Sequence, residues 1–192
     1  MKSNKYLKSL FYISSFLFLF LAGMIFLSPY GAKDNLKAVI TEITIDAPVE
    51  KLFNYLGDSS NAKQWSSFVK DIKPLNQKLV LDGQKGSKRR CFGKEQGVVW
   101  DEEILEVQPN QKRLLSVFNA KGFPMMATNL LTEQIYEVAP NGKTKLTLSL
   151  FFEEGKRDFV SELKMYFAAY FVEDIFLKNL EQIKNINEIG ES

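Results

Sequence analysis

Residues 43–53 read ITIDAPVEKLF, and within them the periodicity of the apolar residues changes. Up to Ile45 apolar and polar residues alternate, which is typical of a strand with one buried face. From Val49 the apolar residues recur at three- and four-residue spacing, which predicts a helix with one apolar side. That side is made of Val49, Leu52, Phe53 and Leu56.

The boundaries of this helix follow from its flanking residues. Asp46 is placed to cap the helix, Pro48 suits its first turn, and Gly57 is expected to end it. Asp58 and the two serines after it can start a second, short helix that reaches Trp65. A strand followed directly by two short helices is therefore expected.

Beyond these helices, strand-like segments recur at short spacing and a long helix follows. The helix is predicted over residues 158–187, with Asp158 as its N-cap, and more than half of its circumference is apolar. A broad surface must cover it, and a curved sheet is the available one. The predicted strands span residues 87–94, 98–107, 113–119, 130–138 and 144–153.

Two hairpins can be aligned from their turn chemistry. A three-residue loop at 95–97, with Gly97 left-handed, pairs opposite charges on both sheet faces. It sets Phe92 opposite Trp100, Arg90 opposite Glu102, and Arg89 opposite Glu103. In the second hairpin, residues 140–142 match a type I turn followed by a left-handed glycine. It sets Tyr136 opposite Leu146, Gln134 opposite Leu148, and Thr132 opposite Leu150, so one apolar face carries three polar side chains.

Residues 10–27 contain no charged side chain, and Lys2, Lys5 and Lys8 precede them. A helix of this length is about 27 Å long, enough for the hydrocarbon core of a bilayer. No small-x-small pair suited to cleavage follows, so we expect a retained signal anchor; secretion after signal cleavage is the alternative. The lysines place the N-terminus in the cytoplasm and the domain outside. We divide the chain into an anchor, residues 1–32, and one folded domain, residues 38–188.

Composition excludes several function classes. The net charge is only +2, which argues against nucleic acid as a partner. Histidine is absent, which removes the usual general base and the commonest metal ligand. Cys91 is the single cysteine, so no intrachain disulfide can form. Without a phosphate-binding glycine loop or a metal-spaced cysteine cluster, we expect neither a metal nor another cofactor.

The chain resembles the START-like, or SRPBCC, superfamily of polyketide cyclases, dehydrases and lipid-transfer proteins. The resemblance rests on residues 43–53, on Gly57-Asp58 and Trp65, and on residues 100–104 with 106–109 and Arg113-Leu114 behind them. It covers residues 39–187. It implies an α+β helix-grip fold, in which a curved antiparallel sheet wraps around the C-terminal helix and encloses a cavity for hydrophobic molecules. No catalytic motif of the superfamily is carried by this chain, so no catalytic residue is expected.

We therefore expect a membrane-tethered domain that binds an apolar, lipid-like small molecule in an internal cavity. The expected polar anchors are Arg90, Glu102, Thr132 and Gln134, with a surface position of the Arg90–Glu102 pair as the alternative. The expected walls are Phe92, Trp100, Phe118, Met126, Tyr136, Leu148, Leu150, Phe167 and Phe171.

Two other functions stay open. One is a regulatory protein-interaction module of the cell envelope, for which a fully packed interior would be the sign. The other is a cyclase- or dehydratase-like enzyme that uses Glu102 or Tyr136 as its acid–base group.

Overall fold

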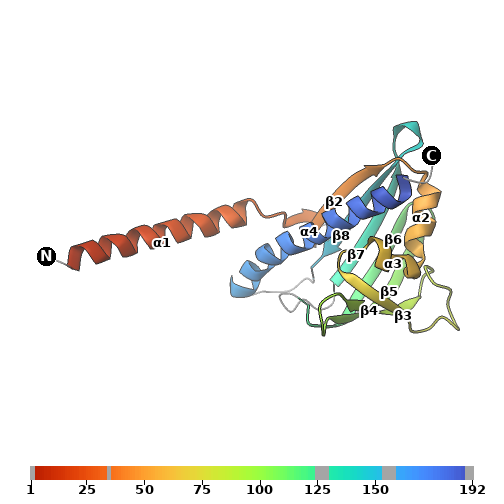
Figure 1. The fold of residues 1–192 in the computed structure, drawn as a ribbon, viewed down its shortest axis with the longest axis horizontal. Coiled ribbons are helices and arrows are strands. Elements are labelled where there is room, and N and C mark those ends of the chain that lie inside the picture. Colours follow the sequence, from red (N-terminus) through yellow and green to blue (C-terminus); the bar gives the residue numbers. More distant parts are fainter. Residues whose placement is uncertain (1–2, 34–35, 124–129, 153–158, 189–192) are drawn as a thin grey trace.

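An eight-stranded antiparallel sheet and a long C-terminal helix form the body of the structure, a computed structural model that describes residues 3–33, 36–123, 130–152 and 159–188 (Figure 1). The strand order is β1-β2-β8-β7-β6-β5-β4-β3. The strands are β1 (Gly31–Lys33), β2 (Leu36–Ile45), β3 (Val69–Pro74), β4 (Lys88–Gly93), β5 (Val99–Gln108), β6 (Lys112–Lys121), β7 (Leu130–Val138) and β8 (Thr144–Phe151).

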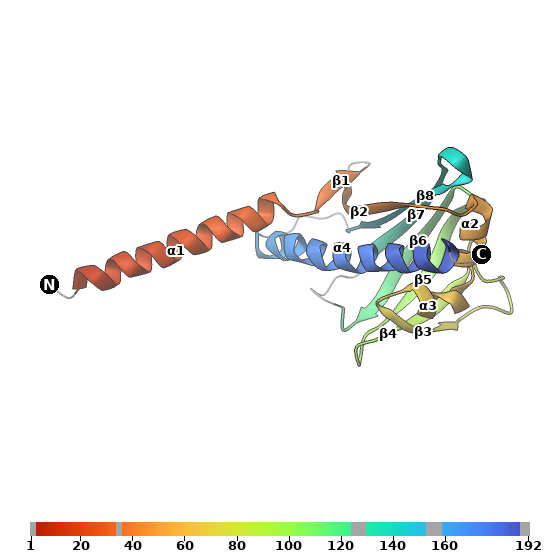
Figure 2. The same cartoon turned by 45° about the horizontal axis from the view of Figure 1, so that its top comes forward.

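The C-terminal helix α4 (Phe159–Glu188) lies across the sheet, which curves around it (Figure 2). Register shifts in β5, between Val99 and Asp101 and between Ile104 and Glu106, mark bulges that bend the strand. The small Ala168 and Ala169 are buried where α4 approaches the strands. This arrangement confirms the predicted helix-grip fold. The predicted cap of α4, Asp158, lies outside the described residues.

Helix α2 (Val49–Gly57), the 3₁₀ turn η1 (Ser59–Asn61) and helix α3 (Ala62–Trp65) follow β2, as predicted. The predicted cap of α2 is wrong. Pro48 occupies the N-cap position, and no side chain caps the helix there. Asp46 lies two residues too early, and its carboxylate instead accepts a hydrogen bond from Lys143 at 2.8 Å.

The five strands predicted after residue 86 are all present, and their ends differ from the prediction by at most two residues. The short strands β1 and β3 were not predicted. In β3 only Val69 is buried, and Ile72 is the other apolar residue before Pro74. Two apolar residues separated by two charged ones do not produce the alternation that predicts a strand.

The predicted register of the β4–β5 hairpin is wrong by one residue. Cys91 lies opposite Trp100, Arg90 opposite Asp101 and Arg89 opposite Glu102. The amide of Gly93 donates to the carbonyl of Val98 at 2.9 Å, so the loop contains four residues, 94–97, instead of three. Gly97 is left-handed as expected, with φ of 84°.

The register of the β7–β8 hairpin is as predicted, with Tyr136 opposite Leu146 and Gln134 opposite Leu148. Its turn, the 3₁₀ turn η3 (Pro140–Gly142), is not the predicted type I turn, because Asn141 is itself left-handed, with φ of 62°. The loop length, and not the turn type, sets this register.

Helix α1 (Ser3–Phe26) extends away from the domain (Figure 1). Its segment Tyr6–Phe26, with mean hydropathy 2.1 and none of its most apolar window buried, is the one helix within the described ranges that is long and apolar enough to cross a membrane. A signal sequence has the same length and composition. The end of α1 contacts α4, where the hydroxyl of Tyr170 donates to the carbonyl of Met24 at 2.7 Å.

Two apolar clusters of the described residues meet at Trp65 and Phe176. One includes Leu52 of α2 and Leu180 of α4, and both side chains are almost fully buried. The other includes Trp100 of β5 and Ala169 of α4.

Candidate ligand cavity

A cavity of about 170 Å³ lies between α4 and the inner face of the sheet. The inner face of β4, β5 and β6 carries Arg89, Trp100, Glu102 and Val117, because Glu102 pairs with both Arg89 and Val117 across the strands. Phe171, which is 39% exposed, stands where the cavity meets solvent.

Most of the cavity wall is apolar. Helix α4 contributes one face, in which the lining residues recur at the three- and four-residue spacing of one side of a helix. Strands β5 to β8 contribute the opposite wall, and the segment between α3 and β3 closes one side. The apolar lining residues are Trp65, Phe68, Val69, Trp100, Leu115, Val117, Phe123, Leu130, Leu148, Leu150, Phe152, Ala168, Phe171, Val172, Ile175 and Phe176.

A half-buried ion pair forms one polar part of the wall. The Arg89 Nε donates to Glu102 Oε2 at 2.7 Å, and the Trp100 Nε1 donates to Glu102 Oε1 at 2.8 Å. Burial lowers the pKa of the Arg89 guanidinium, but the charge and hydrogen bond of Glu102 outweigh it, and the net pKa is raised. Both carboxylate oxygens of Glu102 are therefore engaged, one by a donor of the neighbouring strand β4 and the other by a donor of β5 itself.

A second polar group lies around Gln134. Its Oε1 accepts from the hydroxyl of Tyr136 at 2.7 Å and from Nη1 of Arg113 at 3.3 Å. Tyr136 is buried against Phe53, with ring centroids 5.2 Å apart. Burial, partly opposed by Arg113, raises the pKa of Tyr136 well above its ordinary value. Tyr136 is therefore a neutral hydrogen-bond donor at physiological pH.

The loop between α3 and β3 is held against α4 by a buried amide. Asn179 Oδ1 accepts from the amide of Ser67 at 2.6 Å, and the hydroxyl of Ser66 accepts from the amide of Val69 at 3.0 Å. These bonds fix the segment that carries Phe68, whose ring contacts Trp100 at a centroid distance of 5.4 Å. The aromatic wall is thus held in place by hydrogen bonds to the backbone of this loop.

Seven of the residues predicted for the site line the cavity, and five others within the described ranges do not. The seven are Trp100, Glu102, Thr132, Gln134, Leu148, Leu150 and Phe171. Arg90 and Phe92 lie on the outer face, because the one-residue error in the hairpin register exchanges the two faces of β4. Phe118 of β6 lies on the same outer face, opposite Asp101. Arg90 pairs there with Asp101, so the predicted Arg90–Glu102 pair does not exist.

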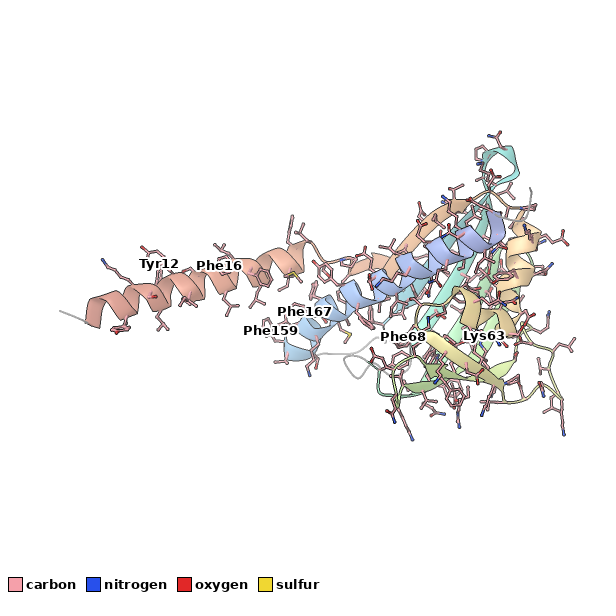
Figure 3. All side chains as sticks on the ribbon, viewed as in Figure 1. Tyr12, Phe16, Lys63, Phe68, Phe159 and Phe167 are labelled. Atoms are coloured by element: carbon pink, nitrogen blue, oxygen red, sulfur yellow. The ribbon has the colours of Figure 1, made fainter. Side chains whose placement is uncertain are left out.

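Two further predicted wall residues have other positions. Phe167 lies on the part of α4 nearest to α1 (Figure 3) and does not line the cavity. It precedes the lining residue Ala168, and one position on a helix turns a side chain by about 100°. Tyr136 packs in the cluster under α2 and reaches the cavity only through Gln134. Met126 lies outside the described residues.

Several lining residues were missed by sequence reasoning. The stripe of Ala168, Val172, Ile175 and Asn179 on α4 has regular helical spacing, but α4 is apolar on other sides too, so spacing alone did not select it. Arg89 was missed through the register error. Trp65 was predicted to end a helix, and no sequence signal indicated that its indole reaches a cavity.

The chemical groups at the cavity favour binding. Among the described residues no three side chains of His, Cys, Asp or Glu are grouped as a metal site would require. Cys91 is buried on the inner face, and its burial raises the pKa of the thiol well above its ordinary value. An apolar wall with a few positioned polar groups is the usual form of a small-molecule site.

Comparison with known proteins gives a family and a fold. A family model described as "Polyketide cyclase / dehydrase and lipid transport" matches residues 38–188. A search of curated proteins gave no match. Among solved structures, protein MLL2253 from Mesorhizobium loti is 18% identical with a TM-score of 0.62, covering 81% of this chain and 99% of its own.

Two other solved structures show the same likeness. The protein XoxI from Bacillus cereus is 16% identical with a TM-score of 0.61, covering 78% of this chain and 94% of its own. The Aha1 dimer from Colwellia psychrerythraea is 17% identical with a TM-score of 0.55, covering 81% of this chain and 98% of its own. At these identities the likeness establishes the fold alone.

Proposed function

The chain belongs to the polyketide cyclase/dehydrase and lipid transport family, and from this membership we propose that it is a membrane-tethered domain that binds an apolar, lipid-like small molecule. The observation that carries the proposal is the apolar-walled cavity of about 170 Å³ under α4. For comparison, an engineered apolar cavity of about 150 Å³ in another protein takes up benzene. The cavity therefore has room for a ring or a short chain.

The proposed contacts divide into walls and anchors. The apolar wall is supplied by Trp100, Leu148, Leu150 and Phe171. The polar atoms are supplied by Thr132 and Gln134 of β7. Burying one methylene group of a guest against such a wall contributes roughly 0.8 kcal/mol. A small guest thus gains most of its affinity from the walls and its orientation from the anchors.

The proposed tether is residues 1–32, with α1 in the bilayer and residues 38–188 as the binding domain. Lys2, Lys5 and Lys8 favour a cytoplasmic N-terminus and a domain on the other side of the membrane. The bond between Tyr170 and Met24 joins the end of α1 to α4, the helix that covers the cavity. A guest could then pass between bilayer and cavity over a short path.

The other two functions have less support. Glu102, which an acid–base mechanism would use, already accepts two hydrogen bonds, and burial raises the pKa of Tyr136. A protein-interaction module would have a fully packed interior and would not need an internal cavity.

Extraction of bound molecules tests the proposal. We expect the full chain, purified with its surrounding membrane lipids in polymer-bounded discs, to carry a guest that mass spectrometry detects after solvent extraction. Val117 lines the cavity and is 4% exposed, so Val117→Phe should fill the space and reduce the guest several-fold relative to wild type. Val138→Phe, at a position 76% exposed, is the matched control and should retain it. Equal extracts from the two variants would contradict the proposal.

A further inference from the structure

The first turns of α4 project beyond the sheet and expose apolar side chains. Helix α4 contains 30 residues and is about 45 Å long, whereas the longest strands contain ten residues and are about 34 Å long. Of the described side chains at the start of α4, residues 159–164, none is buried. Phe159 and Val160, which begin the helix, are 79% and 59% exposed. The sheet therefore leaves an apolar helix end uncovered.

Apolar residues continue along α4 from this end toward the cavity. Residues at four-residue spacing form one row along the surface of a helix. Phe159 and Phe167 lie on the part of α4 nearest to α1 (Figure 3), and Phe171 stands where the cavity meets solvent. The α4 row, as we call it, therefore runs from the uncovered end of the helix to the mouth of the cavity. Its members are Phe159, Leu163, Phe167 and Phe171.

Contacts with α1 hold this part of α4 beside the end of the apolar helix. The hydroxyl of Ser28 donates to the carbonyl of Tyr166 at 3.1 Å, and the hydroxyl of Tyr170 donates to the carbonyl of Met24. The ring of Tyr30 packs edge-on against the ring of Tyr166, with the centroids 5.1 Å apart. In Figures 1 and 2, α4 begins at the level where α1 ends. The first turns of α4 and the last turn of α1 therefore share one level along the molecule.

With α1 in the bilayer, this level is the boundary between hydrocarbon and headgroups. The apolar segment Tyr6–Phe26 is about 31 Å long, which matches the hydrocarbon core of about 30 Å. Its last turn then lies at one boundary, and the first turns of α4 lie there too. Tyr30, Tyr166 and Tyr170 are at the same level, which is where amphipathic rings are enriched in membrane proteins.

The charges of this segment identify the kind of attraction. Glu162 and Lys164 are the charged residues between 159 and 171, and their charges cancel. Burial of apolar side chains must therefore hold the segment to a partner, and the bilayer around α1 is the apolar phase at this level. Resting on the proposed tether, we propose that the first turns of α4 form a second membrane contact. Phe159 and Val160 lie in the bilayer surface, and the α4 row leads an apolar guest from there to the cavity.

Spin labels on the full chain, reconstituted in phosphatidylcholine liposomes, test this contact. Cys91 is fully buried, so a label reacts with an introduced cysteine, and the wild-type chain supplies the background. Val160→Cys carries the label at the proposed contact. Val138→Cys is the matched control, because Val138 is 76% exposed and precedes the turn η3, which lies away from α1 (Figure 1). Collisions of the label with oxygen, which concentrates in lipid, are compared with collisions with a neutral nickel chelate, which stays in water.

We expect the ratio of oxygen to nickel collisions to be several-fold higher at position 160 than at position 138. Phe159→Gln, added to the Val160→Cys chain, removes the larger apolar group and should lower this ratio toward that of position 138. Leu79→Gln is the control for this substitution, because Leu79 is 86% exposed in the loop between β3 and β4. It should leave the ratio at position 160 unchanged.

The outcomes separate this contact from the tether. A label at Phe16→Cys, in the middle of α1, reports whether α1 is in the bilayer. Lipid contact at position 16 with water contact at position 160 leaves the tether as proposed and overturns the second contact. Water contact at position 16 overturns both. A label at position 160 that is shielded from oxygen and nickel alike also overturns the contact, because a second copy or another protein then covers this end of α4.

Discussion

Arg89 and Arg90 are adjacent in β4, yet they form two different kinds of ion pair. Arg89 faces the cavity, and its side chain and that of Glu102 are 11% and 14% exposed. Arg90 faces outward, and its side chain is 47% exposed. Two arginines face three consecutive acids, so either register pairs opposite charges, and the sequence pattern could not separate the two alignments. The loop length decides the register of this hairpin, and a glycine at position 97 does not fix that length.

Asp101 should give the stability of the domain a characteristic pH dependence. Its carboxylate accepts from Arg90 Nε at 2.7 Å and from Asn119 Nδ2 at 3.0 Å. The Arg90 bond, opposed by burial and supported by Asn119, holds the pKa of Asp101 below its ordinary value. Because its pKa is lower in the folded state, the ionised carboxylate contributes its full stabilisation above the pKa of the unfolded state, about 4. This stabilisation is lost as the pH falls through the pKa of the folded state.

The substitution Asp101→Asn tests this dependence. We expect it to lower the melting temperature of the full chain by a few degrees at neutral pH, and we expect the difference from wild type to shrink as the pH falls below about 4. Melting curves of both chains across this range provide the measurement. A difference of the same size at acidic and neutral pH would show that the ionised carboxylate does not stabilise the fold.

At the scale of elements, the long and regular segments were predictable and the short or irregular ones were not. Strands β5 to β8 and helix α4 bury enough regularly spaced apolar residues to be recognised. Strand β3 has few such residues, and it forms because β4 offers it a partner edge, which is a tertiary effect. The cavity-facing side of α4 was unpredictable for a similar reason, since the helix is apolar on several sides and only the sheet selects one of them.

Helix α1 supports a prediction of its own. Phe16 and Phe20 are 72% and 54% exposed in the middle of the apolar segment. An arginine at the centre of a membrane helix costs about 2.5 to 3.5 kcal/mol on the insertion scale, so Phe16→Arg with Phe20→Arg should prevent stable insertion. We expect this double variant to leave the membrane fraction after alkaline washing, whereas Phe16→Leu with Phe20→Leu stays.

The wild-type chain supplies the decisive outcome for the tether. Recovery of the wild-type chain from the soluble fraction, with its N-terminus beyond residue 27, would identify α1 as a cleaved signal sequence. Recovery from membranes with Met1 or Lys2 as the first residue agrees with an anchor.

At the scale of the whole molecule, the cavity results from shape more than from any one residue. The bulged β5 bends the sheet around α4, and Ala168 keeps the helix from filling the space beneath it. The sequence indicated an inner face of apolar and polar side chains on β7 and β8. It could not indicate a volume, because the volume depends on how far the sheet curves and how closely α4 approaches. The contact between the end of α1 and α4 then brings the proposed tether close to the helix that covers the cavity.

Contact quenching of Trp65 and Trp100 by bromobenzene, in the full chain in nanodiscs, tests most directly that the space under α4 accepts an apolar guest. Both indoles line the cavity, and a brominated ring of this size should reach them there. We expect quenching that saturates at one bromobenzene per chain and is lost in Val117→Phe. Quenching that rises without saturation, and equally in wild type and Val117→Phe, would contradict a cavity that takes up guests.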